Sequence, residues 1–340
     1  MAEPSYLEKP VLVAGASGFV GSHITRLLVA QGRKVRVLMR ESSNKAAIEN
    51  LAVEIFHGDV ADPESLRTAM RGCGTVFFSI LDARFWLTDP APIYRTNVDG
   101  LVNAMDAALE TGIERFIFTS TMGTLGQNPN GPVTEDIEFN WRDKACTYIL
   151  ARLEAENRFL AYCREKGLPG VALCVANTYG PEDYNPTPHG GALWEVAAGH
   201  MKYVLDAAQP TVDIRDVAQA ALQAERYGHL GERYIIANEY IHNSDFYQIA
   251  TSVTGAPPPK LIPQKVAYAV AWCAQRICKL LGKKDYLLST DAVYLSDAFK
   301  ELDNSKAREQ LHWQPRPIKE TVVDAVTWFK AQRETKEPAN

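Results

Sequence analysis

A glycine-rich segment near the start of the chain constrains the fold more than any other feature. Four apolar residues, Val11 to Ala14, precede Gly15, Gly18 and Gly21, and helical spacing begins directly afterwards at Ser22. This order predicts a strand, a tight turn and the N-terminus of a helix. The unpaired N–H groups and the positive dipole end of such a helix suit a pyrophosphate, so the segment predicts a dinucleotide site.

The three glycines have separate roles in this type of turn. The first adopts unusual dihedral angles, the second lets the backbone approach the ligand, and the third lets the helix pack closely on the strand. We therefore expect the cofactor to contact the turn and the first helical residues: Gly15, Ser17, Gly18, Phe19, Val20 and Gly21.

Strands and helices alternate through the first half of the chain. After the first strand, strand patterns occupy residues 34–39, 53–56, 75–79, 115–119 and 170–175, and helical spacing occupies 22–31, 65–71, 96–111 and 148–166. Such alternation predicts an α/β fold, a Rossmann-type doubly wound parallel sheet covered by helices on both faces. Ligands then bind outside the carboxyl ends of the strands, where the strand order reverses.

The pattern becomes irregular after residue 180, where prolines and glycines mark a loop-rich stretch. Residues 233–237 look like a late strand that returns to the sheet, and residues 266–281 begin a mostly helical tail. We expect a dinucleotide-binding Rossmann domain over 1–180. A smaller, mostly helical substrate-binding cap and tail would then cover 181–340, with 211–240 returning to the Rossmann sheet.

Composition excludes several classes of protein. The 340 residues carry a net charge of −5 with acids and bases interspersed, which argues against nucleic acid as a partner. The six cysteines form no C-x-x-C pair and no cluster with histidine, so we expect buried apolar residues in a reducing, cytoplasmic setting and no metal site. The longest apolar stretch, residues 266–278, is too short for an integral membrane segment, and we expect a packed helix there, with a helix lying against a bilayer surface as the alternative.

Several further motifs occur in a familiar order, and together they resemble the extended short-chain dehydrogenases/reductases. This family includes dihydroflavonol reductases, 3β-hydroxysteroid dehydrogenases and NAD-dependent sugar epimerases. Besides the glycine turn, the motifs are Gly58-Asp59-Val60, Thr96-Asn97-Val98-x-Gly100, Phe118-Thr119-Ser120-Thr121, Asn177-Thr178-Tyr179-Gly180-Pro181, Asp213-x-x-Asp216-Val217-Ala218 and Gly231-Glu232-Arg233-Tyr234.

The resemblance implies hydride transfer to or from nicotinamide, with a tyrosine hydroxyl that exchanges a proton with the substrate oxygen. Tyr148 occupies that position, and Thr121 is the expected hydroxyl partner, with Ser120 as the alternative. An unperturbed tyrosine titrates near pH ~10, so a nearby cation has to lower its pKa. A second Tyr-x-x-x-Lys match, Tyr162 to Lys166, lies at the far end of the same helix and is interpreted as structural.

The family's lysine is replaced here by Arg152, four residues after Tyr148. The i,i+4 spacing keeps a cation beside the phenol, and a guanidinium can donate to ribose hydroxyls. We expect a smaller lowering of the tyrosine pKa and a reduced rate. The alternative is a site that binds the cofactor without turnover, since the two cations are not interchangeable.

The end of the second strand indicates the choice of cofactor. Arg40, with Ser43 behind it, suits the 2′-phosphate of NADP, whereas Glu41 would suit the ribose hydroxyl of NAD. We expect NADP, with NAD as the alternative. The resemblance implies further cofactor contacts from Asp59, Val60, Ser79, Ile80, Thr119, Tyr148, Arg152, Ala176 and Thr178.

The expected substrate pocket is rich in apolar and aromatic side chains. It draws on residues 82–86, Met122, Gly123, Trp141, Tyr179 and the stretch from Tyr184 to Trp194, and Asn177 is a further candidate to face the substrate. Such a lining predicts a bulky hydrophobic ketone or aldehyde, or the matching alcohol. A nucleotide-sugar epimerase or dehydratase with bound NAD is the alternative. The resemblance also implies a homodimer formed through the fourth and fifth helices.

Overall fold

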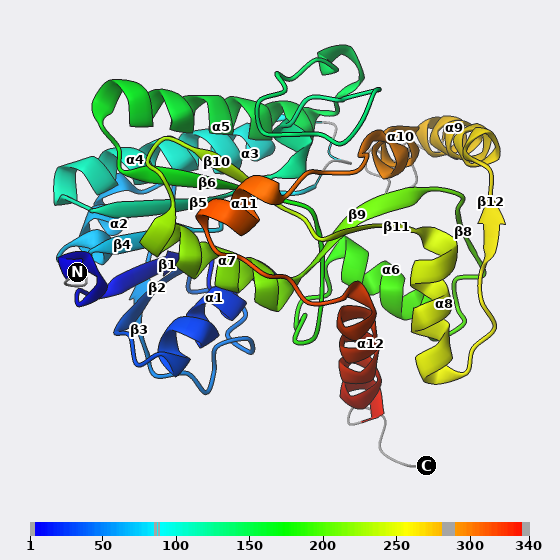
Figure 1. Cartoon of the computed structure of the whole chain (residues 1–340), viewed down its shortest axis with the longest axis horizontal. Helices are drawn as coiled ribbons and strands as arrows, with labels where there is room; N and C mark the ends of the chain where they lie inside the picture. The colour runs from blue at the N-terminus through cyan, green and yellow to red at the C-terminus, as the bar shows by residue number, and fades with distance from the viewer. Residues whose placement is uncertain (1–3, 85–86, 88, 281–289, 335–340) are drawn as a thin grey trace.

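A seven-stranded parallel sheet forms the larger part of the molecule. The structure is a computed structural model that describes residues 4–84, 87, 89–280 and 290–334 (Figure 1). The strand order is β10-β6-β5-β4-β1-β2-β3, and every neighbouring pair is parallel. The strands are β1 (Val11–Ala14), β2 (Val35–Met39), β3 (Val53–His57), β4 (Thr75–Phe78), β5 (Arg115–Thr121), β6 (Gly170–Val175) and β10 (Arg233–Ile236). This confirms the predicted Rossmann-type fold.

Helices cover both faces of this sheet, as the continuous apolar strands require. On one face are α1 (Phe19–Ala30), α7 (Ile214–Tyr227) and α11 (Ser305–Gln310), and on the other are α2 (Pro63–Met70), α4 (Gly100–Thr111) and α5 (Thr147–Lys166). The predicted helix over 96–111 begins earlier, because α3 (Ala91–Tyr94) and a π-helical turn (Arg95–Asp99) lead directly into α4.

Short strands that the sequence pattern did not reveal lie beyond the large sheet. A three-stranded sheet has the order β11-β9-β7, and a two-stranded sheet pairs β12 with β8. Their bounds are β7 (Asn177–Tyr179), β8 (Tyr203–Leu205), β9 (Ala208–Asp213), β11 (Glu239–His242) and β12 (Lys260–Ile262). Three helices, α6 (Pro188–Ala197), α8 (Asn243–Thr254) and α12 (Ile318–Glu334), pack together beside them.

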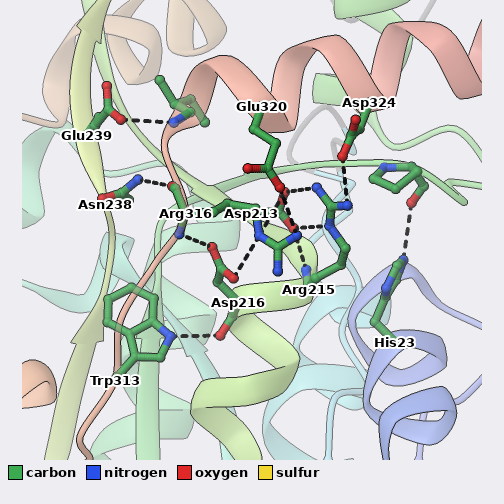
Figure 2. A network of polar contacts seen from close by, with 12 residues as sticks. His23, Asp213, Arg215, Asp216, Asn238, Glu239, Trp313, Arg316, Glu320 and Asp324 are labelled. Carbon is green, nitrogen blue, oxygen red and sulfur yellow. Dashed lines mark hydrogen bonds and ion pairs between the residues drawn. The ribbon is translucent and has the colours of Figure 1, made fainter. Parts of the chain in front are cut away.

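An ion-pair network fastens α12 and its preceding loop to the end of β9 and the start of α7 (Figure 2). Asp216 accepts from the backbone N–H and the Nε of Arg316 at 2.8 and 2.9 Å, and its carbonyl accepts from the Trp313 indole. Asp213 pairs with Arg215, whose other guanidinium nitrogen lies 2.7 Å from Asp324 of α12. The Asp213-x-x-Asp216 motif therefore joins the two parts of the molecule.

Two expectations about individual side chains are wrong. All six cysteines are free, but only Cys73, Cys146 and Cys174 are buried; Cys163 and Cys278 are partly exposed, and Cys273 is exposed. It lies on α9 (Gln264–Leu280), the helix that we expected to be packed along its length. Val266, Val270 and Ile277 on this helix are each more than half exposed, because α9 lies with α10 (Thr290–Ala298) at the edge of the molecule.

A buried carboxyl group in the loop after β7 predicts a pH-dependent stability. Asp183 is 2% exposed and accepts from the N–H and hydroxyl of Thr187, while its Oδ1 has no partner. Burial raises the pKa of Asp183 to about 6, so its contribution to stability is full below about pH 4 and is lost as the pH rises through 6.

We expect Asp183→Asn to raise the free energy of unfolding at pH 8 by up to about 3 kcal/mol, the free-energy equivalent of the difference between the two pKa values. At pH 4 the variant and the parent protein should unfold alike, because both side chains are then neutral. Chemical denaturation at the two pH values measures this. A variant that is destabilised equally at both would contradict it.

Candidate active site

The glycine turn lies where the strand order reverses, between β1 and β4. Gly15 has a φ of +98°, which favours glycine, and its carbonyl accepts from the Gly18 N–H at 2.9 Å. A Cβ on Gly15 would lie 2.9 Å from the Ser79 backbone, and one on Gly21 would lie 2.2 Å from the Gly15 oxygen. The backbone is therefore packed too closely here for any side chain.

The N-terminus of α1 lies at this turn, and no side chain of the helix caps its N–H groups. Gly18 is the N-cap residue and makes no side-chain cap, and the first turn of α1 carries no acidic residue. The N–H groups at a helix start have no intrahelical acceptor, and together with the helix dipole they favour an anion. The cradle fits the pyrophosphate of a dinucleotide.

The ends of the two strands beside the turn are held together by hydroxyl groups. Ser79, directly after β4, and Thr119 of β5 share a hydrogen bond of 2.9 Å. The carbonyl of Thr119 in turn accepts from Arg152 of α5 at 2.6 Å. The predicted cofactor residues Ser79, Thr119 and Arg152 therefore form one connected group.

Tyr148 lies in the first turn of α5 and meets Thr121 at the end of β5. Burial has the largest effect on the pKa of Tyr148 and raises it. The positive charge of Arg152 and the neighbouring Thr121 hydroxyl lower this pKa, while the negative charge of Asp82 raises it. The net direction is upward, so the lowering that we predicted is wrong. The phenol stays protonated over the neutral pH range.

Arg152 is an incompletely satisfied buried cation. Its side chain has no exposed surface, and its guanidinium lies 4.9 Å from the centre of the Phe118 ring. Only Nη2 has a hydrogen-bond acceptor, whereas Nε and Nη1 have none. Buried donors without acceptors are costly. Because no part of the side chain is exposed, a ligand with hydroxyl groups would satisfy these donors only after the groups that cover them move. The ribose of a nicotinamide nucleotide fits that requirement.

The structure distinguishes Thr121 from Ser120, the two candidates for the hydroxyl partner of Tyr148. Thr121 faces Tyr148, and its Oγ1 also accepts from the Gly123 N–H at 3.2 Å. Ser120 is buried, and its hydroxyl donates to the carboxylate of Glu156. Successive residues of a strand point to opposite faces, so only one of the two can reach the tyrosine.

Glu156 and Arg233 are site-supporting residues that sequence reasoning missed. Glu156, 1% exposed, also accepts from Thr124 at 2.9 Å and from Arg233 of β10 at 2.8 Å. Its negative charge stabilises the charged form of Arg152, one helical turn earlier. The i,i+4 spacing from Arg152 was the available signal, but the pairing with a strand 77 residues away was not visible in the sequence.

Asn97 fixes the loop that follows β4. It is fully buried in the π-helical turn, where its side chain donates to the Asp82 carbonyl at 2.9 Å and accepts from the Asp82 N–H at 3.0 Å. The reciprocal pair holds Asp82 near Tyr148. The predicted pocket residues Phe85 and Trp86 lie outside the described residues.

The residues predicted to hold the adenosine end lie around β2 and β3. Arg40 is exposed directly after β2, and the Ser43 N–H donates to its carbonyl at 3.0 Å. Asp59 accepts from the Ala61 N–H, which makes it part of the turn after β3. Val60 is buried against α4, and its side chain lies within 2.7 Å of where a Gly100 Cβ would be.

Some of the remaining predicted residues lie at the site, and others pack around it. Ala176 follows β6, and its N–H donates to the Ile236 carbonyl at 3.0 Å. Asn177 and Tyr179 both donate to the Gln209 side-chain oxygen, with Thr178 between them on β7. Met122 is buried beside Thr121, and Ile80 lies half-buried after Ser79.

Tyr184 has a different environment from the one predicted for a substrate residue. Its ring packs edge-on against Trp328 of α12, with centroids 5.3 Å apart, and the Arg26 guanidinium lies 5.6 Å from its centre. Among the described residues, these ring contacts bring Tyr184 together with α1 and α12 and not with Tyr148.

The molecule also has a groove of about 1070 Å³ between α1 and α7, lined by several arginines. It contains none of the predicted site residues. These gather at the carboxyl ends of the strands, where doubly wound sheets bind their ligands. The sheet, the glycine turn and the Tyr148 group are together those of a Rossmann-fold nucleotide-binding protein.

Comparison with known proteins agrees with this class. The chain belongs to the NAD dependent epimerase/dehydratase family, whose model matches residues 11–237. A putative dihydroflavonol 4-reductase from Synechocystis sp. is 30% identical, with 94% of each chain covered. The sterol demethylase protein B of Methylococcus capsulatus is 28% identical, over 94% of this chain and 98% of its own. The crystal structure of gox2253 is 32% identical with a TM-score of 0.84, over 95% of this chain and 98% of that one.

Proposed function

We propose that this protein is an NADP(H)-dependent oxidoreductase that reduces a ketone or aldehyde of a bulky hydrophobic molecule. The observation that carries the proposal is the group of Tyr148, Thr121 and Arg152 at the ends of β5 and α5. The group lies beside the glycine turn through the bonded pair Thr119 and Ser79. Residues 1–180 would hold the cofactor and residues 181–340 would cover the substrate.

The residues of the site supply the proton and the orientation for such a reduction. Bound nicotinamide would supply the hydride. Tyr148, kept protonated by burial, would donate its proton to the carbonyl oxygen. Thr121 would hold that oxygen by a hydrogen bond, and Arg152 would stabilise the phenolate left behind and donate to ribose hydroxyls.

An apolar wall next to Tyr148 supports a hydrophobic substrate. Tyr148 packs against a cluster formed by Trp141, Cys146 and Ile149, with Phe139 and Tyr294 at its border. The Trp141 indole donates to the Leu125 carbonyl, so its polar atom is satisfied within the protein. The names of the two relatives, dihydroflavonol 4-reductase and sterol demethylase protein B, refer to polycyclic molecules.

A panel of carbonyl compounds, with NADPH consumption followed by its absorbance, tests the proposal. The panel should compare flavanone-type and steroid ketones with small aliphatic ketones and nucleotide sugars. We expect turnover of the polycyclic ketones. Turnover confined to nucleotide sugars would contradict the proposed substrate class.

Arg40 provides a test of cofactor preference. We expect Arg40→Ala to raise the KM for NADPH about 10-fold or more and to leave that for NADH nearly unchanged, since a paired charge and its hydrogen bonds are worth roughly 1.5–3 kcal/mol. Steady-state kinetics with both cofactors measures this. Glu41→Ala is the matched control, and a parent protein that prefers NADH would overturn the assignment.

A second candidate is a nucleotide-sugar epimerase or dehydratase that retains NAD. The name of the family, NAD dependent epimerase/dehydratase, favours this second candidate. Such an enzyme would retain tightly bound NAD through purification. An assay of the nucleotide released when the purified protein is denatured therefore distinguishes this candidate from the proposed reductase. A homodimer through α4 and α5 remains a prediction for either enzyme.

A further inference from the structure

Exposed apolar side chains are concentrated at one end of the molecule. Among the described residues, thirteen large apolar side chains are exposed, and eight of them belong to β8, β12, α9 or the residues beside them. We call this set the α9 patch. It comprises Met201, Tyr203, Leu261, Val266, Tyr268, Val270, Trp272 and Ile277. A concentration of this kind marks an interaction surface, whereas single exposed apolar residues do not.

The spacing along α9 places part of this patch on one helical stripe. Val266, Val270, Cys273 and Ile277 recur at intervals of four, three and four, so they share one side of the helix. All four are exposed, whereas Ala271, on the opposite side, is completely buried. α9 therefore packs through one face and presents a second apolar face to solvent at the edge of the molecule (Figure 1).

The charge of the α9 patch is opposite to that of the whole chain. The sequence of α9 contains Lys265, Arg276 and Lys279, and no acidic residue occurs from 264 to 284, in a protein with a net charge of −5. The Arg276 guanidinium lies 4.8 Å from the centre of the Trp272 ring, so the cation and the aromatic ring lie together. Lys202 and Lys260 add exposed positive charge beside Tyr203 and Leu261.

We propose that the α9 patch docks on the surface of an anionic lipid bilayer, with α9 lying in the plane of the interface. An exposed apolar stripe with basic residues beside it, and with Trp and Tyr further round the exposed side of the helix, fits the composition of an interfacial helix. Aromatic rings with a polar edge favour the headgroup level, and each cation near an anionic surface adds attraction. No helix in the described part of the chain is long and apolar enough to cross a bilayer, so the contact is with the surface.

A second copy of the chain is a poorer occupant for the same face. A symmetric dimer places the same patch on both subunits, so Lys265 and Arg276 of one copy would meet the same cations of the other. Like charges brought together at an interface are unfavourable. Anionic lipid headgroups complement these charges, while the acyl region accepts the apolar stripe.

Vesicle co-sedimentation of the full chain tests the proposal. The probes are phosphatidylcholine vesicles with and without phosphatidylglycerol. We expect the protein to pellet with the anionic vesicles, to bind the neutral ones at least 10-fold more weakly, and to be released as salt is raised. A parent protein that stays in the supernatant with anionic vesicles would overturn the proposal.

Matched variants distinguish vesicle binding through the α9 patch from non-specific adsorption. We expect Val270→Gln with Ile277→Gln to weaken vesicle binding at least 10-fold, and Leu230→Gln to have no effect. Leu230 is the matched control because it is 55% exposed on another surface, compared with 57% for Ile277. Circular dichroism and NADPH binding show whether each variant is folded.

The mass of the protein in solution shows whether the α9 patch binds lipid or a second copy of the chain. We expect the parent and the double variant to have the same mass in multi-angle light scattering. A dimer that dissociates in the double variant would assign the patch to self-association and overturn the lipid assignment. The lipid test does not depend on turnover, so it can fail or succeed independently of the proposed reductase activity.

Discussion

Replacing Tyr148 with phenylalanine should lower kcat for carbonyl reduction about 100- to 10,000-fold, the usual contribution of a positioned general acid. The change removes the hydroxyl that faces Thr121 and leaves the ring and its packing in place. The dissociation constant for NADPH should change only a few-fold, because in our proposal the glycine turn, and not Tyr148, holds the pyrophosphate. Single-turnover kinetics and cofactor titration separate the two effects.

Tyr162→Phe is the matched control for this substitution. Tyr162 lies on the same helix, begins the second Tyr-x-x-x-Lys match and donates to Asp106 at 3.0 Å. We expect its loss to cost about 1 kcal/mol of stability and to leave kcat unchanged. Equal losses of kcat in both variants would contradict a catalytic role for Tyr148.

The direction of the Tyr148 pKa also predicts how the parent protein depends on pH. A raised pKa keeps the phenol protonated below about pH 10, so the proton donor for reduction is present throughout the neutral range. We expect kcat for reduction to be flat from pH 6 to 9 and kcat for alcohol oxidation to rise with pH. The Tyr148→Phe variant should lose this rise.

Arg152 should have the second largest effect, and its two substitutions should differ. Arg152→Met removes the charge that stabilises the phenolate, and we expect kcat to fall on the order of 100-fold. Arg152→Lys keeps a charge at the position and should retain most of the activity. Stability should change little in Arg152→Met, because the loss of the bond to the Thr119 carbonyl is offset by the removal of a buried cation with two unpartnered donors.

The combination of lower kcat and little-changed stability distinguishes a role in the site from a role in folding. Arg158→Met is the control, since Arg158 is an exposed arginine on the same helix that pairs with Glu154. Thermal unfolding and steady-state kinetics provide the two measurements. If the parent protein and Arg152→Lys both bind NADPH but turn over none of the carbonyl compounds or nucleotide sugars, the site binds its cofactor without catalysis.

The sequence was informative where neighbouring residues decide the structure. The glycine spacing predicted the turn after β1, and the alternation of strands and helices predicted the parallel sheet. The Tyr148 and Arg152 pair was visible because i,i+4 residues share a helix face. Short strands such as β7 and β12 were not visible, since three residues are too few to show a period.

The surroundings of the site depended on contacts between distant segments. The choice between Ser120 and Thr121 depended on which strand face meets α5, and Glu156 acquired its partner from β10. Tyr184 was expected to face the substrate, but α12 returns from the end of the chain and packs against it. The sequence left open whether α9 is packed or lies against a surface, because apolar spacing shows that a helix has an apolar face, not whether another element covers it.

The sequence by itself determined the order of the main elements and the glycine turn, and it placed Arg152 one helical turn after Tyr148. These follow from backbone sterics and helical or strand periodicity, which act over a few residues. Only the tertiary structure decided the sign of the Tyr148 pKa shift and the incomplete hydrogen bonding of Arg152. Burial outweighs the adjacent charge, and burial is a property of the whole fold because it is produced by residues far apart in the chain.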